Sequence, residues 1–491
     1  MPNSSLPAPI FAMDPSDMNR LRAQLRALPD AHRLSDVTIE QCLISADALL
    51  QLPTVLDRYA PTRILITMDA VPMLRGHQDL KTLVGQLASL AGVPLDVLVV
   101  PPGDDGQVHA SVRNAQLVES HLTIGTVVVS VGSGSITDTT KHGCFLFDEA
   151  TGGHTPWIAV QTANTVTAFT SNMAVLLKDG VKRTFHSRYP DVLISDLQVL
   201  SAAPVDLTRA GIGDMMAKWV CYGDWYLAHV LGLAPTYSES PLQLMADMDR
   251  LVLPYAQAAS QGDLTGTEVL TKALLLSGMA MAIVDETTPL SGFEHVQSHV
   301  LDMTAHHYRR DFVLHGLQVG VTVLLASAAW DILFADLDAA ALPAEIPAPA
   351  AGAMKARIDA AFGSVDPSGS MAAECWNDYR QKLDAWAGAQ AAYTAFRADW
   401  ATTVKPKLHA LVYTPEQIAS ALQASGCPLT GDQLTPAVSA ENLAFAFEHA
   451  PLIRKRFTVA DLLQFAGWTG PAFTERVLER VRHAIAVVSD C

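Results

Sequence analysis

Near residue 204 the spacing of apolar residues changes from a mixture of strand-like and helical spacing to helical spacing alone. This change limits the possible folds more than any other feature of the sequence. Before it, short runs rich in β-branched residues alternate with stretches of helical spacing, whereas only helical spacing remains after it. The runs that predict buried strands are 63–70, 94–102, 126–132, 157–163 and 191–196. Because strands that alternate with helices form a parallel sheet covered on both faces, we expect an α/β domain followed by an all-helical region.

A chain of 491 residues is too long for one ordinary core, so two domains are the simplest expectation and three are possible. We expect an N-terminal extension over 1–35, an α/β domain over 36–204 and a helical domain over 205–491. Alanine and proline are frequent from about 335 to 370, which predicts an exposed or flexible connection within an insertion at about 335–400.

The composition limits the partners of this protein. Hydrophobic residues make up 49% and charged residues 17% of the chain, as in a well-buried globular enzyme. The net charge of −17 disfavours a nucleic-acid surface but still allows a small phosphorylated ligand, because a few local cations bind one. We expect no signal peptide and no apolar run of membrane-spanning length. A soluble cytoplasmic protein without a nucleic-acid or membrane partner follows.

The cysteines are scattered and include no CxxC pair, so neither a disulfide framework nor a cysteine metal site is expected. They are Cys42, Cys144, Cys221, Cys375, Cys427 and Cys491.

The segment VVVSVGSGSITD, over 127–138, predicts a strand, a tight turn and the start of a helix. Glycine lets backbone N–H groups approach phosphate oxygens, and a helix N-terminus favours their negative charge. We therefore place Gly132, Gly134 and Ser135 under a pyrophosphate. The third glycine of the GxGxxG fingerprint is missing, so an ordinary βα turn explains the segment about equally well. The long strand before it and its position at mid-domain favour the ligand.

Three segments downstream carry candidate metal ligands beside glycines or apolar helix residues. Asp214 has apolar neighbours, so its carboxylate is costly unless paired or metal-bound, although an N-cap or a salt bridge with Lys218 is the commoner explanation. His295 and His299 share one helix face because they are four residues apart, and His315 starts a strongly apolar helix. A carboxylate with two imidazoles holds Zn²⁺ or Fe²⁺ and leaves a coordination position open for substrate.

These histidines allow more than one interpretation. Glu294 precedes His295 instead of following it, so the HExxH zinc-protease motif is not formed. A single histidine more often has a core or surface role than a ligand role, and the nearby His306 and His307 show that histidine richness explains part of the pattern. The joint occurrence of the carboxylate and the histidines nevertheless favours a metal site.

Seven stretches of the sequence, in their order along the chain, resemble one known superfamily. They are VGSGSITDTTKH, QTANTVTAFTSNMAVLLKDGVKRTF, ISDLQVLSAAP, AGIGDMMAKW, SGFEHVQSHVLDM, HGLQVG and APLIRKRFTVADLL. The superfamily joins iron-dependent alcohol dehydrogenases, glycerol dehydrogenases and dehydroquinate synthases, and the likeness is greatest to its sn-glycerol-1-phosphate dehydrogenase branch. It covers about 60–330 and resumes near 440–465. The resemblance implies a dehydroquinate synthase-like fold, with a Rossmann-like dinucleotide-binding domain followed by an all-α metal-binding domain.

The resemblance also implies roles for individual residues. One divalent metal would be held by Asp214, His295 and His315, and His299 would lie near the substrate as the catalytic, proton-handling residue. Contacts with NAD(H) or NADP(H) are implied at Asp69, Gly132, Ser133, Gly134, Ser135, Asp138, Thr162 and Ser171. Asp69 ends the strand that faces the adenosine ribose in the family, which weakly favours NAD⁺.

Two features depart from the family pattern. Thr167 stands where the family commonly has an aspartate close to the substrate or nicotinamide, which puts the substrate, and dehydrogenation itself, in question. The chain is also longer than expected for the family, through the insertion and the N-terminal extension. Arg309 and Arg310, just before His315, are candidates to receive a substrate phosphate, although two surface arginines are the simpler explanation.

We therefore predict a metal-dependent, NAD(P)-linked oxidoreductase that interconverts a small ketone and a secondary alcohol of the glycerol-1-phosphate and dihydroxyacetone phosphate type. Zn²⁺ is the metal expected first, with Fe²⁺ or Ni²⁺ as alternatives, and the protein is expected to form a homo-oligomer.

Two other functions stay open. One is a lyase or cyclase like dehydroquinate synthase, which recycles NAD⁺ within one turnover. The other is a catalytically diverged relative that only binds the cofactor. The synthases usually have Glu as the first metal ligand, so Asp214 favours a dehydrogenase, and the complete ligand set argues against the diverged relative.

Overall fold

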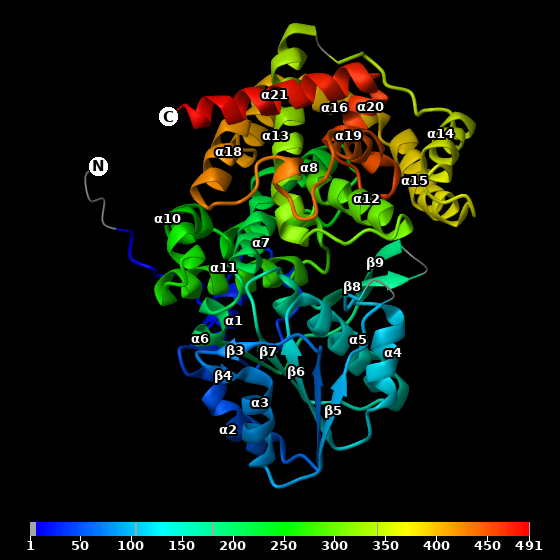
Figure 1. Cartoon of the computed structure of the whole chain (residues 1–491). Helices are drawn as coiled ribbons and strands as arrows, with labels where there is room; N and C mark the ends of the chain where they lie inside the picture. The colour runs from blue at the N-terminus through cyan, green and yellow to red at the C-terminus, as the bar shows by residue number, and fades with distance from the viewer. Residues whose placement is uncertain (1–5, 104–105, 179–180, 341, 491) are drawn as a thin grey trace. The chain divides into compact units, whose positions relative to one another are not determined.

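The chain divides into two compact units (Figure 1). The computed structural model describes residues 6–103, 106–178, 181–340 and 342–490. Unit 1 comprises Met1–Ile212 and Ser238–Glu286, and unit 2 comprises Gly213–Tyr237 and Thr287–Cys491. The sheet therefore shares unit 1 with helices that follow residue 204, so the observed division lies later in the chain than the change of sequence pattern.

The centre of unit 1 is a six-stranded sheet in which every neighbouring pair of strands is parallel. In spatial order the strands are β1 (Gln41–Ser45), β10 (Val192–Asp196), β7 (Trp157–Gln161), β6 (Thr126–Gly132), β2 (Arg63–Met68) and β5 (Leu95–Val99). All except the edge strand β1 are strands that the apolar runs predict. Strands β6, β7 and β10 are buried at every residue, as parallel strands covered on both faces must be.

Helices cover both faces of this sheet (Figure 1). Helices α2 (Leu52–Tyr59) and α3 (Leu80–Ser89) pack on one face, in a core that includes Ile64 and Val129. Helices α4 and α5 lie on the other side in Figure 1. The remaining helices of unit 1 are α1 (Met18–Arg26), α4 (Val112–Ser120), α5 (Gly134–Thr151), α6 (Leu197–Ser201), α9 (Ser240–Leu244), α10 (Met248–Ser260) and α11 (Leu264–Ala282).

Two antiparallel strand pairs accompany the main sheet, and the apolar runs did not indicate either. They are β8 (Met173–Lys178) with β9 (Val181–His186), and β3 (Leu74–Arg75) with β4 (Gln78–Asp79). The sequence between β8 and β9 is Asp179-Gly180, a strong two-residue hairpin signal, although these two residues lie outside the described part of the chain.

The N-terminal extension packs against helices that are distant in the sequence. Tyr255 of α10 donates a hydrogen bond to the Pro7 carbonyl at 2.8 Å, and Arg250 donates to the Ile10 carbonyl at 2.7 Å. Lys272 of α11 forms an ion pair with Asp14 at 2.8 Å. These contacts make the described part of the extension a component of unit 1.

Unit 2 contains only helices and loops among its described residues, as the helical spacing beyond residue 204 predicts. Its helices are α8 (Lys218–Val230), α12 (Phe293–His307), α13 (His315–Ala340), α14 (Ala351–Gly363), α15 (Ser370–Gly388), α16 (Gln390–Asp399), α17 (Lys405–Leu411), α18 (Pro415–Ala424), α19 (Ala440–His449), α20 (Val459–Phe465) and α21 (Pro471–Ser489). Helix α7 (Val205–Met216) crosses the division, because Gly213 begins unit 2. A parallel α/β sheet with a following helical unit is the predicted fold class, and it is confirmed.

The expectation of an exposed or flexible connection, made for about 335–370, is wrong for residues 351–363, which form α14; α15 and α16 follow within the insertion. Phe362 and Trp386 are fully buried, and Trp386 Nε1 donates to the Ile346 carbonyl at 3.0 Å. Lys382 pairs with Asp461 of α20 at 2.6 Å, with both side chains almost completely buried. Alanine favours helices, and the apolar residues recur at helical spacing, so this segment buries an apolar face in unit 2.

Helix α13 corrects the expectation that no apolar run reaches membrane-spanning length. Its segment His315–Asp336 is 22 residues long with mean hydropathy 1.7, which satisfies the length and composition of a membrane span. However, 94% of its most apolar window is buried inside the protein, the environment of a core helix.

Candidate active site: a metal-ligand cluster and a phosphate turn

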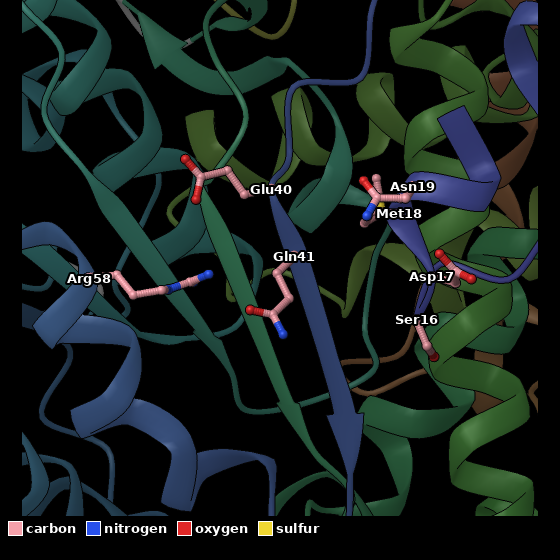
Figure 2. A pocket seen from close by; sticks show the side chains of 7 residues that line it. All are labelled: Ser16, Asp17, Met18, Asn19, Glu40, Gln41 and Arg58. Atoms are coloured by element: carbon pink, nitrogen blue, oxygen red, sulfur yellow. The ribbon is translucent and has the colours of Figure 1, made fainter. Parts of the chain in front are cut away.

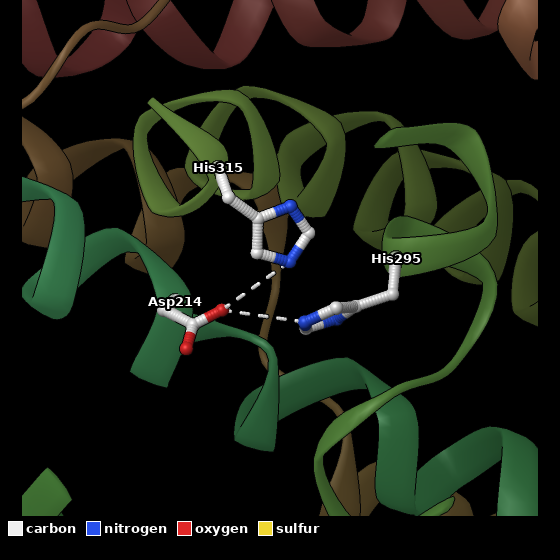
Figure 3. Close-up of side chains that lie close together, drawn as sticks. All are labelled: Asp214, His295 and His315. Atoms are coloured by element: carbon white, nitrogen blue, oxygen red, sulfur yellow. Dashed lines mark ion pairs between the residues drawn. The ribbon is translucent and has the colours of Figure 1, made fainter. Parts of the chain in front are cut away.

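Asp214, His295 and His315 come from α7, α12 and α13, all three residues belong to unit 2, and their side chains face one another (Figure 3). One ligand atom from each residue lies within 4.8 Å of the others. The Nε2 atom of His295 is 3.3 Å from Asp214 Oδ1, and the Nε2 atom of His315 is 3.9 Å from the same oxygen. The structure therefore brings together the residues that the family resemblance implies as ligands.

Close backbone packing of α7 against α13 places Asp214 beside His315. A Cβ atom at Gly213 would overlap the carbonyl oxygen of Gly316 and would lie 3.6 Å from the Cα atom of Gly320. Because only glycine leaves this space, the helices approach at the residues that adjoin the two ligands. The glycines of GIGD and HGLQVG thus assemble the cluster.

Glu294 orients His295. The Oε1 atom of this fully buried carboxylate is 3.0 Å from His295 Nδ1 and also accepts a 2.6 Å hydrogen bond from the Gly292 amide. A histidine that donates through Nδ1 presents the lone pair of Nε2, which is the nitrogen that faces Asp214.

Ser298 contacts the corresponding ring nitrogen of His315. The Oγ atom of Ser298 lies 3.1 Å from His315 Nδ1. The Gln318 side-chain amide meets the same Oγ atom at 2.5 Å, and with its nitrogen on that side it also donates to Asp302 at 3.2 Å. Both ligand histidines therefore have a fixed ring orientation, with Nε2 directed into the cluster.

The environment of the cluster suits a divalent cation. Asp214 Oδ1 is buried and has no well-formed hydrogen bond among the described residues. Burial, and then the charge of Glu294, raise the pKa of the nearby Asp224 well above its usual value. A cation would offset this concentration of buried carboxylates.

The pKa of His295 reflects its position between two carboxylates. Burial lowers its pKa, but contacts with Asp214 and Glu294 raise it more, to about 9. A cation at Nε2 would replace the proton there, because a metal-bound imidazole is neutral.

His299 lies beside the ligand cluster without belonging to it. Its ring centroid is 6.1 Å from that of His315 and 6.5 Å from that of His295. The Nη2 atom of Arg454 is 3.4 Å from His299 Nδ1. With Nδ1 as the acceptor, the ring proton is on Nε2, from which the imidazole can donate a hydrogen bond.

In unit 1, the predicted phosphate turn joins β6 to α5. Gly132 ends the strand, Gly134 starts the helix, and Ser133 between them makes no side-chain capping bond. Residues Ser133, Gly134 and Ser135 are half-buried. The first-turn amides of a helix attract an anion, so the turn has the form of a phosphate site. Gly134 is also required by packing, because its Cβ would lie 2.8 Å from Val166.

Two residues predicted to contact the cofactor, Asp138 and Asp69, form ion pairs with lysines. Asp138 pairs with the fully buried Lys141 at 3.0 Å and accepts a hydrogen bond from the Val175 amide. At the end of β2, Asp69 pairs with Lys81 at 2.6 Å. Burial lowers the pKa of Lys141, although Asp138 counteracts this effect. Asp138 therefore supports the fold around α5, whereas Asp69 and Lys81 present a neutral pair.

Thr162, Thr167 and Ser171 lie in the loop between β7 and β8. The Thr162 amide donates to the Gly132 carbonyl at 3.3 Å, and Ser171 Oγ accepts from the Met173 amide at 3.2 Å. A Cβ atom at Gly278 of α11 would overlap the Thr167 carbonyl oxygen. The loop is thus packed directly on α11.

Two cavities of about 350 Å³ lie elsewhere. The one in unit 1 contains none of the predicted site residues (Figure 2), and it is lined by Ser16, Asp17, Met18, Asn19, Glu40, Gln41 and Arg58. The one in unit 2 is lined in part by Arg309, Arg310 and Gln318. Both arginines are exposed, and Arg310 lies over the ring of Tyr308 at 5.0 Å. They are not members of the ligand cluster.

Known proteins resemble this chain in sequence and in fold. The family model described as iron-containing alcohol dehydrogenase matches residues 43–204. A glycerol-1-phosphate dehydrogenase [NAD(P)+] of Bacillus subtilis is 30% identical over 311 residues, which are 63% of this chain and 76% of the relative. The chain belongs to the iron-containing alcohol dehydrogenase family. Another relative, the glycerol-1-phosphate dehydrogenase [NAD(P)+] of Thermofilum pendens, is 29% identical over 59% of this chain and 77% of its own length.

The fold of the family also agrees with solved structures. The glycerol dehydrogenase of Schizosaccharomyces pombe superposes with a TM-score of 0.54 at 12% identity and covers 93% of this chain and 91% of its own. At this identity the likeness concerns the fold alone.

Sequence reasoning missed the residues that orient the ligands. Glu294 entered only as evidence against a zinc protease, and Ser298 and Arg454 had no assigned role. A ligand histidine almost always has a partner on its second nitrogen, so the polar residues beside His295 were a usable signal. Arg454 lies far from the histidines in sequence, and no local pattern identifies it.

Proposed function

We propose that this protein is a metal-dependent, NAD(P)-linked oxidoreductase that interconverts a small phosphorylated ketone and its secondary alcohol. Glycerol 1-phosphate and dihydroxyacetone phosphate are the proposed substrate pair. The observation that carries the proposal is the cluster of Asp214, His295 and His315 in a member of this family. The curated relatives named for glycerol 1-phosphate and NAD(P)+ support the substrate.

Each residue has a defined part in the proposed reaction. Asp214, His295 and His315 hold the cation, while Glu294 and Ser298 fix the two imidazoles. The cation supplies Lewis-acid polarisation of a carbonyl oxygen, and the dinucleotide supplies the hydride. His299, or a water relayed through it, would supply the proton that the substrate oxygen gains as the hydride adds to the carbonyl carbon.

The phosphate turn would bind the dinucleotide. The amides of Ser133, Gly134 and Ser135 at the start of α5 would receive the pyrophosphate. Asp69 would face the adenosine ribose with its charge offset by Lys81, so we propose that both NAD(H) and NADP(H) are accepted.

Three finer assignments belong to the same proposal. Zn²⁺ is proposed as the metal because imidazole and carboxylate ligands suit it, with Fe²⁺ and Ni²⁺ as alternatives. A homo-oligomer, at least a dimer, and a cytoplasmic location are also proposed. Metal analysis of the purified protein and light scattering after gel filtration test the first two.

The decisive experiment measures net oxidation of NADH and NADPH with dihydroxyacetone phosphate, in protein loaded in turn with Zn²⁺, Fe²⁺ and Ni²⁺. We expect stoichiometric oxidation and formation of glycerol 1-phosphate. A lyase like dehydroquinate synthase would produce no net change in the dinucleotide. Binding of dinucleotide and metal without turnover of any ketone would instead indicate a catalytically diverged relative.

A further inference from the structure

Arg454 lies beside His299, the residue proposed to handle the proton. It is in the loop between Ala450–Leu452 and α20, is half-buried, and its guanidinium contacts the ring of His299 at 3.4 Å. His299 in turn stacks beside the ligand His315, with ring centroids 6.1 Å apart. The His299 ring therefore contacts the Arg454 guanidinium and also lies beside the ring of the ligand His315.

The loop that carries Arg454 is tied to the start of α12. Arg456 donates to the carbonyl and, at 2.8 Å, to the hydroxyl of Ser291. The amides of Val459 and Phe293 donate to the two oxygens of Asp224, each at 2.8 Å. The loop and the helix that supplies His295 and His299 are thus held by the same groups, which positions the backbone that carries Arg454.

We propose that Arg454 binds the phosphate group of the substrate, an inference that rests on the function proposed above. The planar guanidinium has five N–H donors and matches two phosphate oxygens, so it can contact both His299 and an anion. The ligand cluster, the His299 ring and Arg454 follow one another in that order. They suit a short molecule with a carbonyl at one end and a phosphate monoester at the other.

Arg309 and Arg310 are less suitable for this role. Their cavity reaches Gln318, whose amide meets Ser298 on the Nδ1 side of His315. The cation and the substrate oxygen would be on the Nε2 side of that ring. Both arginines are exposed, so a phosphate held there would also compete with water.

The test compares Arg454→Met and Arg454→Lys with the controls Arg309→Met and Arg310→Met. For each metal-loaded protein, kcat/KM is measured with dihydroxyacetone phosphate and with dihydroxyacetone, which lacks the phosphate. We expect Arg454→Met to lower the ratio of the two values on the order of 100-fold, because a charge-assisted pair is lost. Arg454→Lys should lower it less, and the control variants should keep the wild-type ratio.

Calorimetry with glycerol 1-phosphate provides a readout that does not require turnover. Wild-type protein and both control variants should bind it, and Arg454→Met should bind it on the order of 100-fold more weakly. Unchanged metal content and NADPH binding show that the variant is folded.

Equal losses with both ketones would overturn the proposal, because Arg454 would then act only through His299. A selective loss in Arg309→Met or Arg310→Met would also overturn it, in favour of the cavity in unit 2. The proposed function is contradicted by a different result, namely that the wild-type protein oxidises neither NADH nor NADPH with any ketone. Calorimetry with glycerol 1-phosphate still tests the role of Arg454 in that case.

Discussion

The two candidate sites of this protein are built in opposite ways. The phosphate turn is formed by one continuous stretch, in which β6, Ser133 and α5 follow each other directly. The metal-ligand cluster combines Asp214, His295 and His315, which lie on three different helices. The first and last of these helices come together where Gly213 packs against Gly316. A local site depends on the chain near it, whereas an assembled site depends on how closely helices pack. Substitutions should therefore affect the two sites independently.

His315→Ala should have the largest effect, because it removes a ligand without changing unit 1. We expect metal content to fall to background and kcat/KM to fall by at least about 1,000-fold, while the affinity for NADPH is unchanged. Metal analysis, steady-state kinetics and NADPH fluorescence measure these three quantities. Full turnover in metal-free His315→Ala protein would contradict the assigned cluster.

Gly213→Ala tests whether helix approach assembles the cluster. Its Cβ would overlap the Gly316 carbonyl, so we expect a loss of about 1–3 kcal/mol in the free energy of unfolding together with weaker metal binding. The matched control is Gly85→Ala in α3, where a Cβ meets nothing within 4 Å. The control should stabilise the protein by up to about 1 kcal/mol. Equal metal affinity in both variants would show that the glycine contact is irrelevant to the site.

Glu294→Gln tests the orientation of His295. Loss of the carboxylate beside Nδ1 should weaken metal binding by about 10- to 100-fold. Competition with a chelator measures this affinity. An unchanged affinity would mean that helix packing alone fixes the His295 ring.

Gly134→Ala is the complementary substitution in the local site. A Cβ at this position would press against Val166 and displace the first turn of α5, so we expect about tenfold weaker NADPH binding. Metal content should stay at the wild-type level. A parallel loss of metal would show that the two sites are not independent.

Lys81→Met should have the smallest effect. With Asp69 left unpaired, the 2′-phosphate of NADPH should be disfavoured, and the ratio of NADPH to NADH affinity should fall about fivefold. Asp69→Asn should change that ratio in the opposite direction. Dinucleotide titrations of both variants and the wild type give the result.

The glycine turn shows why local features can be read from a sequence. The apolar run of β6, the small residues and the start of α5 are contiguous, so their geometry follows from local backbone preferences. The same reasoning identifies the strands of the sheet apart from β1. It fails for residues 351–363, where composition indicates flexibility but α14 forms and buries Met354, Ile358 and Phe362.

The sequence by itself determined the class of fold, the turn at Gly132 to Ser135 and, through the resemblance, the identities of the three ligand residues. Only the tertiary structure decided that Glu294 and Ser298 orient the histidines, that Lys81 neutralises Asp69, and that Arg454 reaches His299. The physical reason is distance along the chain. Backbone preferences act over a few residues, whereas the position of Arg454 depends on buried contacts that join the loop before α20 to the start of α12.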